Sequence, residues 1–311
     1  MTAQFIISFD CEGKWGMADQ ISSYHQPFFT TTNFKRTYRK LLSVLGKYNI
    51  KATFAFVGAF SLSMDVYQMY RHELKEVFIN GRPWLDIFKR EMHTGQKEGW
   101  FAPECYEMVK EAHEHEIASH GFTHLPLDEK SISLENFQHE MYLLKKYAPY
   151  KDHDHLSFIY PRNKIGYTQE LTKYGFIGYS DVLQTSWQGF ARPIASIARE
   201  FNIFERSDAI GPMACPVIIP PGRFLNWRHG FRKRIPFTVT LKRWECMLQD
   251  AIKNDGVVHL WTHPHNFIDG DRMFALLEKI LENVANAQER GKIKSLTQRD
   301  FCLRLLGRYA N

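Results

Sequence analysis

The sequence predicts an α/β fold, because three features of the chain agree. Short apolar runs typical of buried strands alternate with longer segments whose apolar residues recur at helical spacing. This alternation favours parallel strands with helices packed outside them. Polar residues also cluster directly after several of the strands, where such folds place their functional groups. We expect a (β/α) barrel of irregular shape, with an open doubly wound sheet as the alternative.

The first hundred residues predict two strands, one helix and an insertion. Residues 5–9 form an apolar run that predicts a buried strand, and residues 51–58 predict a second strand, closed by glycine. The segment between them carries apolar residues at helical spacing: Phe34, Tyr38, Leu41, Leu42, Leu45 and Tyr48. Residues 61–103 are polar and aromatic by turns, and we expect them to form a partly helical insertion.

The rest of the chain continues the alternation. The predicted strands are residues 117–120, 157–160, 176–180, 257–261 and 293–296. The predicted helices lie near residues 103–113, 134–144, 168–174, 241–252 and 272–288, with one more at the end. Residues 182–236 are Pro-rich and irregular, which predicts a second insertion. No linker or repeat interrupts the pattern, so we expect residues 1–311 to form a single domain.

Composition restricts the class of protein. The chain has 311 residues, of which 44% are hydrophobic and 24% charged, as in soluble globular proteins. No run approaches the ~20 apolar residues that span a bilayer, and the first residues lack the pattern of a secretion signal. The five scattered cysteines contain no C-x-x-C pair and fit reduced thiols. We therefore expect a cytoplasmic location.

The net charge of +6 is concentrated near residues 223–234, where basic and aromatic residues interleave. The stretch is either a solvated loop or a surface for phosphate-bearing or membrane-anchored glycans. No nucleic-acid recognition motif accompanies it, so we expect no nucleic-acid partner. Membrane contact, where it occurs, is expected to be peripheral.

Four polar clusters follow predicted strands and are expected to meet at one rim of the barrel. They are Asp10-Cys11-Glu12, the pair His120 and His124, Pro161-Arg162-Asn163, and Thr262-His263-Pro264-His265. Two histidines with a carboxylate from another strand end are the ligand set of a catalytic zinc-type site, which leaves a fourth position for water. A second carboxylate could accept a proton from that water, and a histidine opposite could protonate a leaving group.

Several of these segments resemble the motifs of the polysaccharide-deacetylase (NodB-homology) family, in the family's order. They are residues 9–16 (Phe-Asp-Cys-Glu-Gly-Lys-Trp-Gly), residues 52–58, residues 115–124 (His-Glu-Ile-Ala-Ser-His-Gly-Phe-Thr-His) and His263-Pro264. The resemblance implies a distorted (β/α) barrel of the NodB-homology type, a divalent metal, and hydrolysis of acetyl groups on sugars. It also implies that Asp10 is the catalytic base, that His120 and His124 bind the metal, and that His263 is the general acid.

Three positions depart from the family pattern. Cys11 stands where the family has a second aspartate, with Glu12 one place on. Because side chains alternate along a strand, Asp10 and Glu12 can share a face, so we expect Glu12 to be the third metal ligand. Cys11 remains the rival, since zinc also accepts a thiolate.

The second and third departures concern Arg162 and His263. The arginine motif is reversed, as Pro161-Arg162-Asn163, and Arg162 either orients Asp10 or is an ordinary surface arginine. His263 stands in Thr-His-Pro-His, which leaves His265 as a competing acid. Four aromatic residues could stack on sugar rings or belong to the core: Tyr24, Trp100, Trp187 and Trp227.

The sequence thus predicts a metal-dependent enzyme, with zinc favoured by the ligand types. Its expected reaction is removal of an acetyl group from a sugar of a surface polysaccharide or of its cytoplasmic precursor. The expected partner is an acetylated glycan, with phosphate-bearing and lipid-linked forms as candidates. Two alternatives remain: a metal-dependent hydrolase of a small cyclic amide or ureide, and a glycan-binding or assembly protein without efficient turnover.

Overall fold

A computed structural model describes residues 2–21, 26–183, 200–202 and 204–307. Within that part, nine strands form one sheet in the order β8-β7-β6-β5-β2-β1-β10-β9, with β11 paired to β1. Every strand pair in this sheet is parallel. Its strands are β1 (Ala3–Cys11), β2 (Thr53–Phe56), β5 (Glu116–Ser119), β6 (Leu156–Phe158), β7 (Phe176–Ser180), β8 (Val217–Ile219), β9 (Arg223–Phe224), β10 (Val257–Thr262) and β11 (Ile293–Leu296).

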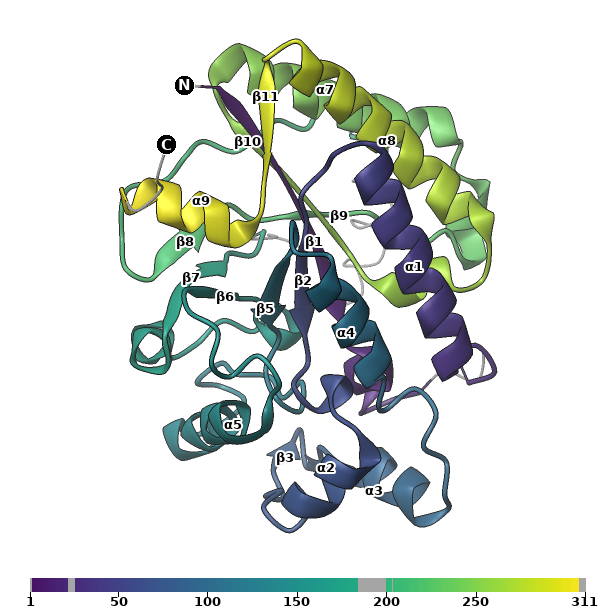
Figure 1. Ribbon diagram of the computed structural model, residues 1–311, viewed down its shortest axis with the longest axis vertical. Helices are drawn as coiled ribbons and strands as arrows, with labels where there is room; N and C mark the ends of the chain where they lie inside the picture. The colour runs from purple at the N-terminus through teal and green to yellow at the C-terminus, as the bar shows by residue number, and fades with distance from the viewer. Residues whose placement is uncertain (1, 22–25, 184–199, 203, 308–311) are drawn as a thin grey trace.

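The sheet curls into an open half-barrel (Figure 1). Among the described residues no pairing joins β8 to β9, so the barrel does not close there. The strand β1 lies at the centre and has two neighbours on one side. Residues 3–6 pair with β11, whereas residues 8–11 pair with β2. The predicted distorted (β/α) barrel is confirmed, and the doubly wound alternative is set aside.

Helices cover the sheet in the predicted alternation. They are α1 (Thr31–Lys47), α2 (Met64–Tyr70), α3 (Asp86–His93), α4 (Pro103–Glu111), α5 (Leu134–Tyr147), α7 (Phe237–Asn254), α8 (Asp271–Glu289) and α9 (Gln298–Leu305). In Figure 1, α1, α7 and α8 lie together on one side, and α9 packs against β6, β7 and β8 on the other. None of the described helices combines the length and the apolar character needed to cross a membrane.

Short 3-10 helices occupy several connections after the strands. They are η1 (Gly13–Met17), η2 (Ala59–Ser61), η3 (Pro161–Asn163), η4 (Thr168–Tyr174), η5 (Gly230–Arg234) and η6 (Pro264–Phe267). The helix expected near residues 168–174 is thus a 3-10 helix, η4. Residues 61–103 are partly helical, as expected, and add the hairpin of β3 (Phe78–Ile79) and β4 (Arg82–Pro83). This segment lies at the end of the sheet toward which β1 runs (Figure 1).

The prediction that residues 182–236 are an insertion is wrong in part. This segment contributes β8 and β9, the two outer strands of the main sheet. Both strands are very short and lie among prolines, so the strand pattern is too brief to stand out in the sequence. Residues 184–199 and 203 of the segment lie outside the described part of the chain.

Alternation along β1 separates an apolar face from a polar one. Phe5, Ile7, Phe9 and Cys11 pack into the main hydrophobic core with α1, and Cys11 is fully buried there. The intervening side chains point to the opposite, concave side of the curled sheet, as alternation requires. Most of them are polar and all are buried: Gln4, Ser8 and Asp10, followed by Glu12 just past the strand. A buried polar lining therefore leads along β1 to the rim where the strand ends.

Candidate metal centre

The ends of three strands bring five polar side chains to one place on the rim. Asp10 and Glu12 come from the end of β1, and His120 follows β5 directly. His124 comes from the turn after His120, and His263 follows β10. Because these strands are parallel and near the centre of the sheet, their C-terminal ends lie at the same edge.

Glu12, His120 and His124 have the separations of a metal-ligand set. Glu12 Oε2 lies 2.9 Å from His124 Nε2 and 3.4 Å from His120 Nε2. The two histidine Nε2 atoms are 3.2 Å apart. Ligands about 2.0–2.1 Å from a tetrahedral zinc ion are roughly 3.3 Å from one another. The three atoms are thus spaced as zinc requires, and all three residues are buried.

The surroundings of these side chains fit a bound divalent ion. His120 Nδ1 donates a hydrogen bond to the carbonyl oxygen of Ile159 at 2.8 Å, which leaves its Nε2 lone pair directed at the group. Asp10 Oδ1 is buried, and the described residues supply no hydrogen-bond partner for it. Buried acceptors are rarely left unpaired, so a water molecule or ligand beside Asp10 would complete the site.

Burial and the neighbouring charges give the two carboxylates opposite pKa shifts. Burial raises the pKa of Asp10 above its usual range, although the nearby His120 and His263 oppose the shift. Burial also disfavours the charged form of Glu12, but His263 and His124 outweigh it and hold the pKa of Glu12 well below its usual range. Two carboxyl groups with divergent pKa values are typical of a site where one binds and the other exchanges a proton.

The pKa values of the two ligand histidines, His120 and His124, also shift in opposite directions. Burial lowers the pKa of His124 to about 4, so this ring stays neutral, as a metal ligand must be. Burial also disfavours charge on His120, but Asp10 and Glu12 raise the pKa of His120 above its usual value.

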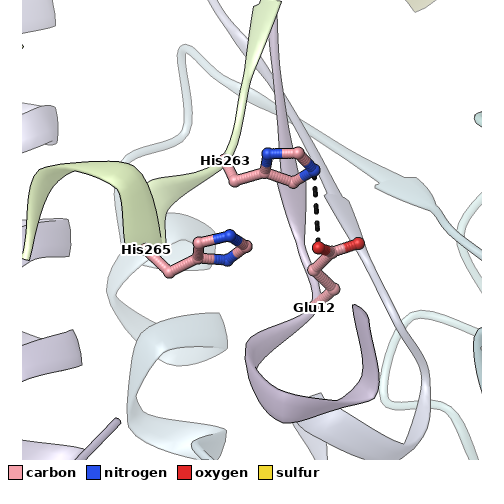
Figure 2. Close-up of side chains that lie close together, drawn as sticks. All are labelled: Glu12, His263 and His265. Atoms are coloured by element: carbon pink, nitrogen blue, oxygen red, sulfur yellow. Dashed lines mark ion pairs between the residues drawn. The ribbon is translucent and has the colours of Figure 1, made fainter. Parts of the chain in front are cut away.

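His263 approaches the second carboxylate oxygen of Glu12, the one that the two ligand histidines do not contact most closely. Its Nε2 is 3.4 Å from Glu12 Oε1, and its side chain is 19% exposed, so a substrate could reach it. Its ring stacks on that of His265, with centroids 4.7 Å apart (Figure 2). The ligand atoms of Glu12, His263 and His265 also lie within 4.8 Å of one another. His263 is the partly exposed member of this second group.

Cys11 does not join either group. Its Sγ lies 3.4 Å from the carbonyl oxygen of Phe9, within the core beside Tyr38. Burial raises the pKa of the Cys11 thiol well above its usual value. Among the described residues, the group of potential ligands that holds His120 and His124 includes Glu12 and not Cys11, and the role of Glu12 as third ligand stays a prediction.

Arg162 is not where a partner of Asp10 would be. Its guanidinium pairs with Asp19 and donates to the carbonyl oxygen of Gly16 at 3.1 Å. It also lies over the ring of Trp84, 5.3 Å from the centroid. Arg162 thus contacts the η1 loop, and no contact with Asp10 is found among the described residues. A catalytic role for Arg162 by another route stays a prediction.

Most of the other side chains considered for sugar or phosphate binding are buried. Trp100 is fully buried and cannot stack on a sugar, whereas Trp227 is partly exposed and stacks on His229. Arg228 is buried, with its guanidinium over Phe237, and is not available to a phosphate at the surface. Tyr24 and Trp187 lie outside the described residues.

Two residues that shape the site, Gly16 and Glu140, are not among those expected from the sequence. A Cβ atom at Gly16 would overlap the carboxylate of Glu12. The signal for Gly16 was only its place at the end of the first motif. Glu140 had a clearer signal, because it interrupts the apolar stripe of Phe137, Met141 and Leu144 on α5. A charged residue on a buried helix face needs a partner, and sequence alone does not name it.

Known proteins share a sequence motif region and the fold with this chain. The family model described as polysaccharide deacetylase matches residues 27–147. A crystal structure from Mycobacterium smegmatis assigned as a polysaccharide deacetylase superposes with a TM-score of 0.53 and 15% identity, covering 98% of this chain and 91% of that one. The polysaccharide deacetylase Bc1974 from Bacillus cereus has a TM-score of 0.39 at 12% identity, with coverages of 95% and 91%.

A CE4 family pseudoenzyme from Bacillus anthracis has a TM-score of 0.41 at 12% identity, with coverages of 97% and 66%. No curated protein matches this chain. The curled parallel sheet, with its polar groups at the strand ends, defines a NodB-type barrel. Residues 27–147 match the polysaccharide-deacetylase family model, and the chain as a whole shares the fold of the Mycobacterium smegmatis structure.

Proposed function

We propose that this protein is a metal-dependent hydrolase that removes an acetyl group from a sugar of a surface polysaccharide or of its cytoplasmic precursor. The observation that carries the proposal is the group of Glu12, His120 and His124, flanked by Asp10 and His263. Three ligands, one further carboxylate and one accessible histidine are the parts that hydrolysis of an amide or ester requires.

The three ligands would hold one divalent ion, with zinc favoured by the mixture of imidazole and carboxylate. When bound, such an ion polarises the carbonyl of the acetyl group and lowers the pKa of water beside it. Glu12 suits the ligand role because its pKa is held low and its carboxylate stays charged. Ile159 fixes the ring of His120 through Nδ1.

Asp10 and His263 are assigned the two proton transfers. Asp10 Oδ2 lies 3.9 Å from His120 Nε2, so Asp10 borders the ligand group without belonging to it. Its raised pKa suits a general base that takes a proton from the attacking water. His263 lies 3.4 Å from Glu12 Oε1 and is partly exposed, so it can donate a proton to the amine or alcohol that leaves.

An assay for acetate release tests the proposal. Zinc-loaded protein is incubated with N- and O-acetylated nucleotide sugars, lipid-linked sugars and oligosaccharides, and free acetate is measured. Asp10→Asn protein serves as the control, because it keeps all three ligands. Acetate released by the wild type and not by Asp10→Asn supports the proposal, whereas no release from any acetylated sugar contradicts it.

A second candidate is a glycan-binding protein without efficient turnover, and the position of Arg162 favours it. Arg162 pairs with Asp19, so it does not hold Asp10 ionised. This candidate predicts binding of an acetylated glycan without acetate release. The alternative of a hydrolase for cyclic amides or ureides is tested in the same assay. A cyclic ureide is added as substrate, and ring opening is measured.

We also propose a cytoplasmic location, on the sequence argument given above. The basic residues Arg232, Lys233 and Arg234 of η5 are partly or fully exposed, and they support at most a peripheral contact with anionic or phosphate-bearing glycans. Fractionation of cells that carry the tagged protein tests the location, and recovery outside the cytoplasmic fraction contradicts it.

A further inference from the structure

Between His120 and His124, the turn is held from outside at its three carbonyl groups and at the N–H groups of Phe122 and Thr123. Gly121 accepts a hydrogen bond from the N–H of Gly58 at 2.8 Å, and Phe122 accepts one from the N–H of Ala59 at 3.0 Å. The carbonyl oxygen of Thr123 accepts a third bond, from the indole of Trp84 at 3.0 Å. The carbonyl side of the turn is therefore held by η2 and by the insertion of residues 61–103.

One side chain, that of Glu140 on α5, holds the N–H side. Glu140 Oε2 accepts hydrogen bonds from the N–H groups of Phe122 at 3.1 Å and Thr123 at 2.9 Å. Its Oε1 accepts a third bond from the hydroxyl group of Thr123 at 2.7 Å. Glu140 is only 4% exposed. A charged acceptor bonded to three donors in a buried setting is a strong constraint on the turn.

The turn needs such a constraint because its backbone is unusual. Gly121 has φ +74° and His124 has φ +59°, both in the left-handed region. Residues other than glycine rarely adopt that region, and they keep it where the surrounding structure enforces it. It is this backbone that turns His124 Nε2 back to within 3.2 Å of His120 Nε2.

We infer that Glu140 is a positioning residue for the metal centre, holding His124 in the geometry that a divalent ion requires. The inference rests on the proposed metal site. Glu140 is not a ligand itself, because neither group of potential ligands among the described residues includes it. It also forms no ion pair with a described basic residue at salt-bridge distance, and its hydrogen bonds go to Phe122 and Thr123 of the turn.

Glu116 provides a matched control. It begins β5, the strand whose other end leads into His120. It is fully buried and accepts hydrogen bonds from the hydroxyl groups of Thr53 at 2.8 Å and Ser157 at 2.7 Å. It also accepts one from the N–H of Arg299 at 2.8 Å. Loss of the Glu116 charge should therefore destabilise the fold, as loss of the Glu140 charge should. The difference is that, among the described residues, Glu116 makes no hydrogen bond to the turn that carries His124.

The test compares zinc affinity in wild type, Glu140→Gln and Glu116→Gln, each below its own unfolding temperature. We expect Glu140→Gln to weaken zinc binding by about 10- to 100-fold, the usual effect of removing a group that orients a ligand. We expect Glu116→Gln to bind zinc as the wild type does. The visible spectrum of bound Co²⁺ should change in Glu140→Gln and not in Glu116→Gln.

Thr123→Val is the second variant, in case Glu140→Gln does not fold. It removes one of the three bonds to Glu140 and should weaken zinc binding by a smaller factor. Unchanged zinc affinity in the folded variants, or equal losses in Glu140→Gln and Glu116→Gln, would overturn the inference. Absence of zinc binding in the wild type would instead contradict the proposed function, so the two failures are distinguishable.

Discussion

Gly16 lies directly against the carboxylate of Glu12, so that a Cβ atom at Gly16 would sit 2.8 Å from Oε2 and closer still to Oε1. The η1 loop thus approaches the metal ligand so closely that only glycine fits. The same carboxylate oxygen, Oε2, is the one nearest to His124. Backbone from one loop and imidazole from another therefore enclose Glu12.

Gly16→Ala should displace Glu12 from its position between the two histidines. We expect zinc affinity to fall by about 10-fold or more, because a misplaced ligand costs affinity even when its chemistry is intact. Titration with a chromophoric chelator measures the effect. Gly46→Ala on α1 is the control, since a Cβ there meets no neighbouring atom. Equal affinity in the two variants would show that the loop adapts.

Glu12→Gln should weaken metal binding, and Cys11→Ser should not. A neutral amide is a poor ligand for a divalent ion, whereas the thiol of Cys11 lies in the core beside Tyr38. Cobalt spectra separate the two possibilities, because a thiolate ligand gives an intense near-ultraviolet band that a carboxylate does not. A band of this kind in the wild type that disappears in Cys11→Ser would reverse the assignment.

Asp10→Asn and His263→Gln should keep the metal and lose turnover. Each removes a positioned proton-transfer group, which typically costs on the order of 10²- to 10⁴-fold in rate. His265→Gln tests the competing acid and should have the smaller effect, since His263 lies 3.4 Å from Glu12 Oε1 and is partly exposed, whereas His265 is buried. Steady-state acetate release measures all three. A larger loss in His265→Gln than in His263→Gln would exchange their roles.

His259 should make the protein less stable as the pH falls from about 6.5 to about 4. Burial lowers the pKa of His259 to about 4, while its Nδ1 donates to the carbonyl oxygen of Pro220 at 3.0 Å. The unfolded chain binds a proton near the ordinary value of 6.5, so it takes up protons first as the pH falls. The free energy of unfolding therefore keeps its full value above pH 6.5. It decreases as the pH falls to the folded pKa of about 4, by on the order of 3 kcal/mol in total.

The measurement is the unfolding temperature of wild type and His259→Asn at a series of pH values. The variant should show a shallower decrease between pH 6.5 and pH 4, whatever its stability at pH 8. His113→Asn, at an exposed position, should follow the wild type. Parallel curves for wild type and His259→Asn would contradict this prediction.

The fold was predictable where segments are long and regular. The helix α1 and the strand β10 carry strong periodicity, and both were located to within a few residues. The strands β8 and β9 were missed because two or three residues among prolines carry no periodicity. Their place in the sheet depends on pairing with β7 and β10, which sequence patterns do not encode.

The site was predictable where its residues follow strands. Parallel strands bring their C-terminal ends together, so Asp10, His120 and His263 were expected to meet. The partners of Arg162 were not predictable, because Asp19 lies on a distant loop and the pairing depends on a positive φ at Arg162. The role of Glu140 was not predictable either. Its place among the apolar residues of α5 indicates that it is buried, but the sequence does not show which turn it binds.

The proposed metal centre is tested most simply by the metal content of the protein and of its His120→Ala,His124→Ala variant. Both are saturated with zinc, passed over a desalting column and measured by elemental analysis. We expect about one zinc ion per chain in the wild type and none above background in the folded double variant. Equal zinc content in the two proteins, or a wild type that retains none, would contradict this expectation.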